Sequence, residues 1–172
     1  RTIAPSRFGY LRTPMRKDNS PKAMADAFAD LLDTLKIPSV CVLGTSSGGP
    51  CALQFAIRHP RRVRALVLNV CVVHAYEGIS RTARINNSIG WRSDFLFWYV
   101  TDKLGDKCGT QYGISEEYVK SLSSEEQEYL RSVWRMGNPV SQRRRGMLND
   151  LKPRANDYPI ERISAPTLIV HA

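Results

Sequence analysis

The sequence of 172 residues contains no hydrophobic run long enough to cross a bilayer, so we expect no membrane span. It also shows no internal repeat and no low-complexity tract. Its four cysteines form no Cys-x-x-Cys pair and no spacing typical of metal ligands. Three of them, Cys41, Cys51 and Cys71, lie in patterns that we expect to be buried. We interpret them as small apolar residues in a reducing, cytoplasmic setting, and we expect no metal and no cofactor.

Acidic residues are few beside basic ones, with 16 Asp and Glu against 25 Lys and Arg and a formal net charge of +9. Such a balance can attract nucleic acid or an anionic surface. The basic residues are scattered, however, apart from the segments 58–64 and 143–145, and they are not interleaved with aromatic residues as in nucleic-acid modules. We expect no nucleic-acid partner, and we keep an anion patch at Arg143, Arg144 and Arg145 as a rival hypothesis. The oligomeric state is left open.

One short motif, Gly44-Thr45-Ser46-Ser47-Gly48, follows an apolar run at 39–43 and precedes a helical pattern that extends to about residue 58. A serine between two such glycines, placed between strand and helix, is typical of a nucleophile elbow. Glycine is expected at positions 44 and 48, because the tight turn should leave no room for a Cβ there. Ser46 should then be strained and exposed.

The elbow assigns chemical roles to two neighbouring serines. Ser46 is the candidate nucleophile, and it needs a base because a free hydroxyl is a poor nucleophile. The backbone N–H of Ser47 follows the nucleophile at a helix N-terminus, which makes it a candidate oxyanion donor. The alternative interpretation of Ser46 is a serine in an ordinary tight turn.

The rest of the pattern predicts an α/β fold with a mostly parallel sheet and flanking helices. Ser20 and Pro21 open a helix that should stop before Pro38. The apolar run at 65–73 is typical of a strand buried on both faces. We expect further strands at 1–5, as the end of a strand, and at 163–171.

The segment 74–162 is polar and mainly helical, which indicates a cap inserted between two strands of one sheet. Helices are expected at 94–104, 115–122 and 124–136, with a capping box formed by Ser124 and Gln127. The predicted organisation is therefore a core at 1–73 that carries the elbow, a helical cap at 74–162, and a core strand at 163–172.

The chain resembles the serine-nucleophile branch of the α/β-hydrolase superfamily over nearly its whole length. The residues that carry the resemblance are the elbow with its third glycine, Gly49, the helix end and strand at 59–68, and the strand region at 161–171. The segment 3–13 resembles the family's loop pattern Asp-x-x-Gly-x-Gly-x-Ser; Gly9 keeps it, whereas Ser6, Leu11 and Thr13 depart from it.

The resemblance implies a triad in the order serine, acid, histidine, with the acid just after the strand at 167–171. Neither that acid nor the histidine is present, and an oxyanion strand between those at 1–5 and 39–43 is also missing. We expect an internal piece of a longer hydrolase that is inactive alone. Asp150 and Asp157 are kept as possible relocated acids.

Several histidines and aromatic residues outside the elbow are further candidates for the site. His74 should lie near the mouth of the active site, where it could touch substrate or be a plain loop residue. Trp91, Phe95 and Trp98, with their aromatic neighbours, form either the core of the cap or an apolar substrate pocket over Ser46. His59 and His171 are interpreted as structural.

The function that this reading favours is esterase-like hydrolysis of a small carbonyl substrate through an acyl-enzyme on Ser46. C–C bond hydrolysis, peptide cleavage and acyl transfer stay open because one fold hosts many reactions. The alternatives are a non-catalytic α/β-hydrolase-like binding protein and a truncated inactive fragment.

Overall fold

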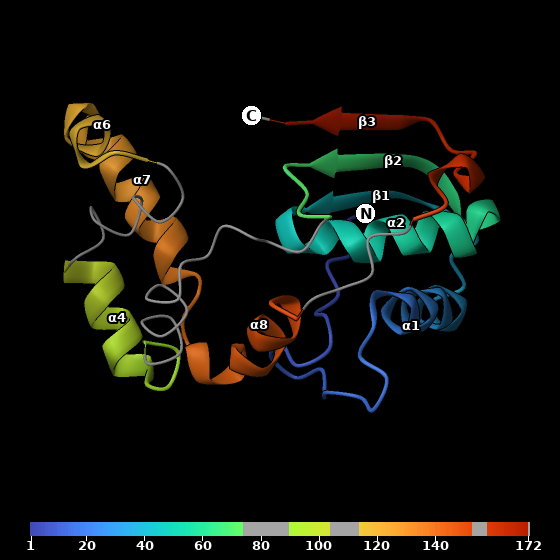
Figure 1. Cartoon of the computed structure of the whole chain (residues 1–172), viewed down its shortest axis with the longest axis horizontal. Helices are drawn as coiled ribbons and strands as arrows, with labels where there is room; N and C mark the ends of the chain where they lie inside the picture. The colour runs from blue at the N-terminus through green and yellow to red at the C-terminus, as the bar shows by residue number, and fades with distance from the viewer. Residues whose placement is uncertain (74–89, 104–113, 153–157, 172) are drawn as a thin grey trace. The chain divides into compact units, whose positions relative to one another are not determined.

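The computed structural model describes residues 1–73, 90–103, 114–152 and 158–171. Two compact units are present: Arg1–Gly9, Thr13–Glu77 and Gly146–Ala172 form the first, and Tyr10–Arg12 and Gly78–Arg145 form the second. The helices and strands, labelled in Figure 1, are α1 (Pro21–Thr34), β1 (Val40–Thr45), α2 (Gly49–Arg58), β2 (Val63–Asn69), α4 (Asp94–Lys103), α6 (Glu116–Ser121), α7 (Ser124–Arg135), α8 (Arg144–Asp150) and β3 (Thr167–Val170).

The sheet of the first unit has three parallel strands in the order β1-β2-β3. Leu43 pairs with Val67, and Leu66 pairs with Thr167. Parallel neighbours need a crossover, and α2 supplies it between β1 and β2. The three strands therefore end at one edge of the sheet, and the elbow follows β1 at that edge. The predicted α/β class with a mostly parallel sheet is confirmed.

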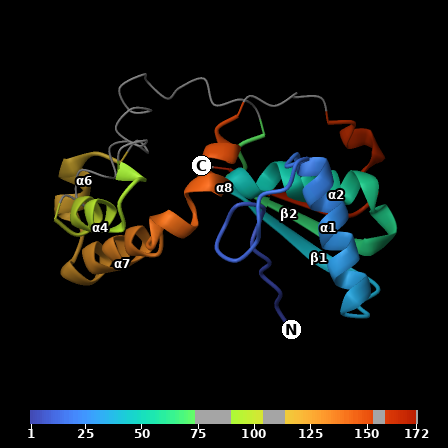
Figure 2. The same cartoon turned by 90° about the horizontal axis from the view of Figure 1, so that it is seen from below.

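Helix α2 lies between the sheet and α1 (Figure 1; Figure 2). All eight residues from Gly49 to Ala56 are buried, as expected of a helix that is covered on both sides. The core joins α1, α2 and β2 through Ala25, Ala29, Leu32, Ala52, Leu53, Phe55, Ala56, Val63, Leu66 and Leu68. This packing holds the first turn of α2, and the elbow before it, in a fixed place on the sheet.

Helix α1 starts as the sequence predicts. The Ser20 hydroxyl accepts a hydrogen bond from the Ala23 N–H at 3.2 Å, and Pro21 opens the helix. The helix ends before Lys36, whose φ is 54°, and Pro38 follows. The cap and the stop signal are both confirmed.

The strands differ from the prediction in three ways. Residues 1–5 form no strand, because none of the described strands pairs with them. The second strand ends at Asn69 and not at residue 73, because Val70 adopts a φ of 46° and turns the chain out of the ladder. It is also not buried equally on both faces: Leu66 and Leu68 are buried, whereas Ala65 and Val67 are half-buried.

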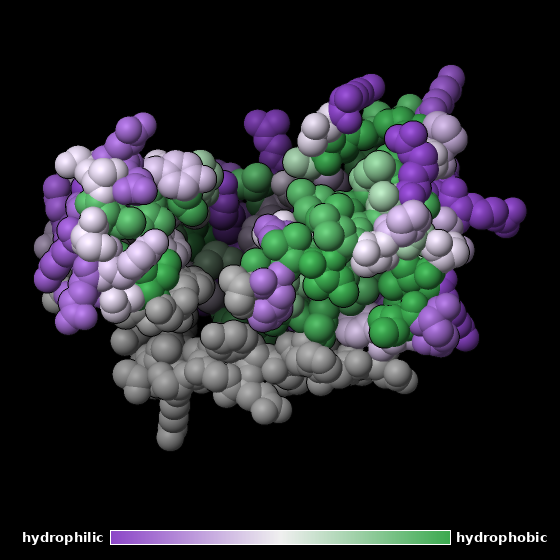
Figure 3. Space-filling view, turned by 90° about the horizontal axis from the view of Figure 1, so that it is seen from above, coloured by the Kyte–Doolittle hydropathy of each residue, from purple (hydrophilic) through white to green (hydrophobic). Residues whose placement is uncertain are grey.

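Burial in the sheet follows the side on which α1 and α2 pack. Cys41 is exposed, so its predicted burial is wrong, while Cys51 is buried and Cys71 is half-buried. All four residues of β3 are exposed. Figure 3 shows apolar side chains gathered on the surface of this unit, and the exposed large apolar residues of its strands are Leu43, Leu168, Ile169 and Val170.

The second unit is helical in its described part. Helix α7 opens with a capping box, but its members are Ser123 and Glu126 and not Ser124 and Gln127. Ser123 has the extended backbone that an N-cap requires, with φ −61° and ψ 158°, and Glu126 stands three residues later. Gln127 instead donates from Nε2 to the Leu122 carbonyl at 3.0 Å.

Two polar links join the helices of this unit. Asp94, at the start of α4, accepts from the Ser141 N–H and from the Ser141 hydroxyl, both at 2.7 Å. Asp102 near the end of α4 pairs with Arg135 of α7 at 2.9 Å. No helix within the described ranges is long and apolar enough to cross a membrane.

Candidate active site: the nucleophile elbow

Ser46 stands directly after the last residue of β1 and begins a 3₁₀ turn, Ser46–Gly48, that leads into α2. Its φ is 49°, a left-handed value that non-glycine residues adopt at a cost of about 1–3 kcal/mol. The residue is exposed. The strain and the exposure predicted for Ser46 are therefore both present.

The three glycines of the elbow differ in whether a Cβ would fit, and not in the way that the sequence predicts. A Cβ on Gly44 would lie 2.7 Å from Ala52 Cβ, so this glycine is needed for the close approach of strand and helix. A Cβ on Gly48 would meet no described atom within 4 Å, so the steric reason predicted for this position is wrong. The crowded third position is Gly49, where a Cβ would come within 2.6 Å of Cys71 Cβ.

The backbone carbonyls of the elbow are held from outside the turn. The Ser46 carbonyl accepts from the Gly49 N–H and from the Val72 N–H, the latter at 3.1 Å. The Gly44 carbonyl accepts from Cys71 Sγ at 3.1 Å. Burial raises the pKa of the Cys71 thiol, against a smaller opposing effect of a backbone hydrogen bond with Asn69, so the thiol keeps the proton that it donates.

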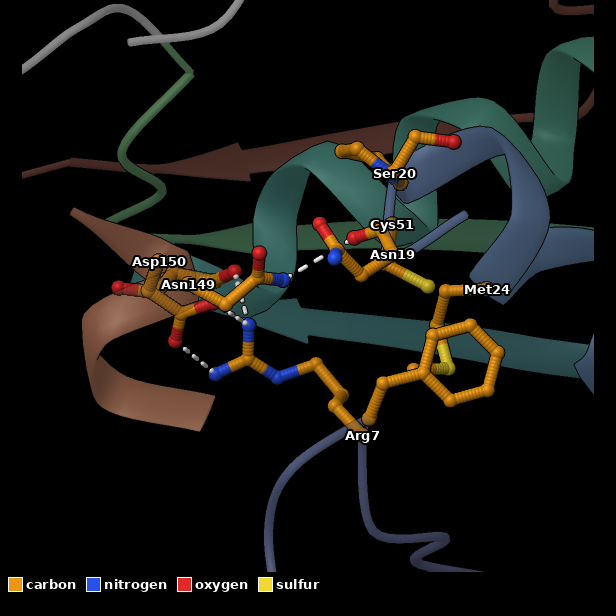
Figure 4. Close-up of a pocket in the computed structure, with 10 residues that line it drawn as sticks. Arg7, Asn19, Ser20, Met24, Cys51, Asn149 and Asp150 are labelled. Carbon is orange, nitrogen blue, oxygen red and sulfur yellow. Dashed lines mark hydrogen bonds and ion pairs between the residues drawn. The ribbon is translucent and has the colours of Figure 1, made fainter. Parts of the chain in front are cut away.

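A side chain from the loop before α1 reaches the same turn. Arg7 Nη1 donates to the Ser47 carbonyl at 2.8 Å and to Asp150 Oδ1 at 2.7 Å, and Nη2 donates to Asp150 Oδ2 at 2.6 Å. The Asp150 side chain is 9% exposed and that of Arg7 is 24% exposed. Figure 4 shows the guanidinium directed at the Asp150 carboxylate.

These residues surround a small hollow of about 20 Å³, room for about one water molecule, beside the elbow on the side of Ser47 (Figure 4). Its lining combines polar and apolar side chains and consists of Arg7, Phe8, Asn19, Ser20, Pro21, Met24, Ser47, Cys51, Asn149 and Asp150. Ser47 belongs to this lining and Ser46 does not, so the hollow lies beside the nucleophile turn.

The aromatic candidates lie in the second unit. Phe95 and Trp98 face each other on α4 with ring centroids 5.8 Å apart, and they are 71% and 39% exposed. Trp91 is half-buried. Phe97 packs inward, because a Cβ on Gly137 would lie 2.7 Å from its ring. The cap-core interpretation therefore fits Phe97, whereas Phe95 presents most of its surface. His74 lies outside the described residues.

Among the remaining titratable candidates, Asp150 and His59 have partners other than a catalytic serine. Asp150 is bound by the Arg7 guanidinium. His59 Nε2 lies 2.9 Å from Asp26 Oδ1, at the end of α2, and His171 follows β3 and is exposed. Asp157 lies outside the described residues. The structure thus gives Asp150 and His59 structural partners, and Asp157 stays a candidate for the acid of a triad.

Sequence reasoning missed Arg7, Cys71 and Val72 as supports of the elbow. Arg7 stands in the segment 3–13, which resembles the family's loop pattern through Gly9 and departs from it at Ser6, Leu11 and Thr13. The sequence gives one partial signal: Pro50 has no N–H and so cannot donate a hydrogen bond to the Ser47 carbonyl. Nothing in the local sequence indicates that Arg7 or Val72 meets the turn.

The strand, the strained serine, the crowded glycines and the following buried helix define a chain of the α/β-hydrolase fold. A family model described as "alpha/beta hydrolase fold" matches residues 1–172. The chain belongs to this family, as the motifs of the elbow and the flanking strands predict.

Among curated proteins, a 2-hydroxy-6-oxo-2,4-heptadienoate hydrolase from Pseudomonas putida is 38% identical over 144 residues, which cover 76% of this chain and 52% of that protein. A 2-hydroxymuconate semialdehyde hydrolase from a Pseudomonas species is 43% identical over 70 residues, which cover 40% of this chain and 25% of that protein. The chain thus spans between a quarter and about half the length of these relatives.

Solved structures agree on the fold. An α/β-hydrolase fold protein from Nakamurella multipartita has a TM-score of 0.63 at 26% identity and covers 95% of this chain and 62% of its own. An enol-lactonase from Burkholderia xenovorans has a TM-score of 0.64 at 17% identity, over 96% of this chain and 60% of its own. The second likeness shows the fold alone.

Proposed function

We propose that this chain carries the nucleophile of a serine hydrolase and that Ser46 is the nucleophile. The observation that supports this most directly is the backbone of Ser46: a non-glycine residue with φ 49°, exposed, at the carboxyl edge of a parallel sheet. Ligands of open α/β sheets bind at this edge, and residues held in strained conformations concentrate at functional sites. An ordinary tight turn does not need a strained serine in a loop that two other segments hold, one with Arg7 and one with Cys71 and Val72.

In this proposal Ser46 Oγ attacks a carbonyl carbon, its proton passes to a histidine, and an acyl-enzyme forms that water then hydrolyses. The histidine and its acid partner belong to parts of the protein beyond the residues described. The Ser47 N–H donates to the oxyanion, because it follows the nucleophile and points from the N-terminal end of α2, where the helix dipole favours negative charge.

The substrate class we propose is a small ester or related carbonyl compound. Trp91, Phe95 and Trp98, with His74, would supply the apolar surface that receives its acyl or alkyl part. In support, Phe95 and Trp98 are 71% and 39% exposed, so both rings present apolar surface that a ligand can contact.

A second candidate function has a specific observation behind it. A curated relative that is 38% identical over 144 residues is named as a hydrolase of 2-hydroxy-6-oxo-2,4-heptadienoate. This chain would then hydrolyse a 2-hydroxy-6-oxo-dienoate, using the same elbow.

Labelling with a fluorophosphonate tests the nucleophile in the full-length protein. We expect one adduct on the peptide that contains Ser46, and none in Ser46→Ala. Ser39→Ala, a half-buried serine in the same unit just before β1, serves as the matched control and should label like the wild type. A full-length protein that gives no adduct on Ser46 and hydrolyses no substrate would overturn the proposal.

Turnover of two substrates separates the two candidate functions. The first is a p-nitrophenyl ester of a short acid, and the second is a 2-hydroxy-6-oxo-dienoate. A preference for the dienoate in kcat/KM, lost in Ser46→Ala, would favour the second candidate over the first.

A further inference from the structure

The turn that carries Ser46 and Ser47 has a backbone carbonyl that a side chain from a distant segment reaches. In a 3₁₀ turn the carbonyl of residue i accepts from the N–H of residue i+3. For Ser46 that donor is Gly49, and the bond is present. For Ser47 the donor would be Pro50, which has no N–H. Arg7 provides a charged donor for this carbonyl at 2.8 Å.

The two peptide planes on either side of the Ser47 Cα are thus held by different segments. The plane that contains the Ser46 carbonyl also contains the Ser47 N–H, and the Val72 N–H fixes it at 3.1 Å. The next plane contains the Ser47 carbonyl, and Arg7 fixes it. With both planes held, rotation about the Ser47 Cα is restricted, and so is the direction of the Ser47 N–H.

Arg7 is itself fixed by Asp150, so it acts as a stiff link. Two parallel bonds to the carboxylate, at 2.7 and 2.6 Å, orient the planar guanidinium, which a single bond would not do. Further bonds hold α8 to the loop before α1: the Gly146 N–H donates to the Gly9 carbonyl at 3.0 Å, and Asn149 Nδ2 donates to the Asn19 carbonyl at 3.0 Å.

We propose that Arg7 is a positioning residue of the elbow: held by Asp150, it fixes the Ser47 carbonyl and thereby the direction of the Ser47 N–H toward the oxyanion. The proposal rests on the proposed function of Ser46. In this role the effect of Arg7 passes through the backbone of Ser47, whose carbonyl it binds.

The chain offers a matched control for a general loss of stability. Arg62 is a guanidinium of similar exposure, 22% against 24% for Arg7. It also bridges a carboxylate and backbone carbonyls, with donors to Asp33 and to the carbonyls of Ile37 and Pro38, both at 2.7 Å. These contacts lie before β1, at the end of the sheet opposite to the elbow. Arg62→Gln should therefore destabilise the fold without moving the Ser47 N–H.

The experiment measures fluorophosphonate labelling of Ser46 in the full-length protein. It separates the rate constant at saturating probe from the fraction of molecules that label, and it records the unfolding midpoint. A structural role changes the labelled fraction and the midpoint, whereas a positioning role changes the rate constant of correctly folded molecules. We expect Arg7→Gln to lower that rate constant by about tenfold or more, since small misplacements of catalytic groups are costly.

Two further variants keep the test decisive if Arg7→Gln does not fold. Arg7→Lys can place one ammonium on Asp150 or on the Ser47 carbonyl but cannot reproduce the fork, so its rate constant should lie between wild type and Gln. Asp150→Asn frees the guanidinium while leaving it charged, and it should lower the rate constant by about threefold. Arg62→Gln should label at the wild-type rate constant.

Each outcome either supports or overturns the positioning role of Arg7. Suppose that Arg7→Gln labels at the wild-type rate constant and only its unfolding midpoint or its labelled fraction falls. The positioning role is then overturned, while the proposed function stands. The same holds for Arg7→Lys and Asp150→Asn if Arg7→Gln does not fold. If the wild-type protein itself gives no adduct on Ser46, the proposed function is overturned and the positioning role with it. A drop in the rate constant for the Arg7 variants but not for Arg62→Gln supports the proposal.

Discussion

Gly49 lies against Cys71 so closely that a Cβ on Gly49 would come within 2.6 Å of Cys71 Cβ and 2.8 Å of Cys71 Sγ. Cys71 reaches this place because Val70 turns the chain out of β2, and its thiol donates to the Gly44 carbonyl. The first turn of α2 and the segment after β2 are therefore in direct contact below the serine.

This contact predicts opposite effects for two adjacent glycines. Gly49→Ala should destabilise the protein by about 1–3 kcal/mol, because the atom in the way is a Cβ fixed to the backbone and not a flexible side-chain end. Gly48→Ala should be neutral or stabilising by up to about 1 kcal/mol, because Gly48 has helical φ −79° and ψ −18° and its Cβ site is open. Chemical denaturation of both variants measures the difference.

A double-mutant cycle identifies the cause. Cys71→Gly removes the obstructing Cβ, so Gly49→Ala should cost much less in that background than in the wild type. An equal cost in both backgrounds would show that the steric explanation is wrong.

The acidic residue of α1 that faces the end of α2 should make stability depend on pH. Asp26 accepts from Arg58 at 2.8 and 2.7 Å, and His59 lies 2.9 Å away. The hydrogen bond from Arg58 is the main cause that holds the pKa of Asp26 below its ordinary value, with His59 acting in the same direction against the opposing effect of burial.

Because the pKa of Asp26 is lower in the folded state, its contribution is fully present above the unfolded value of about 4 and is lost as the pH falls through the folded value. The pair is 40% and 42% exposed, so solvent screening limits its worth to about 0.5 kcal/mol. Asp26→Asn should flatten the acid limb of stability against pH by this amount.

The cap of α1 is expected to matter on its own. Ser20→Ala removes the acceptor for the Ala23 N–H and should cost about 1 kcal/mol, whereas Ser20→Asp keeps an acceptor and should cost little. Thermal unfolding compares the two variants. Equal losses for Ala and Asp would argue that the Ser20 side chain acts through the neighbouring hollow and not as a cap.

In the second unit, Asp94 should determine how firmly α4 is joined to the segment at 140–142. The N–H and the hydroxyl of Ser141 both donate to it and lower its pKa, so the link is present at neutral pH and is lost on strong acidification. Asp94→Asn should accelerate hydrogen exchange in both segments, and Ser141→Ala, which keeps the N–H donor, should do so less. Unchanged exchange in Asp94→Asn would contradict this role.

The sequence predicted what depends on neighbouring residues. Ser20 and Pro21 open α1, and the residues around Ser46 place a strained serine between β1 and α2, because caps and tight turns depend on a few consecutive residues. Element type was also predictable from the hydrophobic period. The position of the capping box was wrong by one residue because two successive serines, Ser123 and Ser124, both carry an acceptor three residues before a Glu or Gln.

What the sequence could not supply depends on distant contacts. Arg7 and Asp150 are 143 positions apart, and no local pattern predicts their pairing. The exposure of Cys41 depends on which face of the sheet α1 and α2 cover. A Cβ would fit at Gly48 but would collide with Cys71 at Gly49. The local sequence does not show this difference, because the place of Cys71 depends on the positive φ of Val70.

The hydrogen bond from the Val72 N–H to the Ser46 carbonyl has a practical consequence. That amide proton can exchange with solvent only when the segment after β2 separates from the elbow. Its protection in deuterated buffer therefore measures how often the nucleophile turn opens, in the absence of substrate, probe or any knowledge of the reaction. One amide signal could rank variants and solution conditions by the integrity of the turn before a substrate is found.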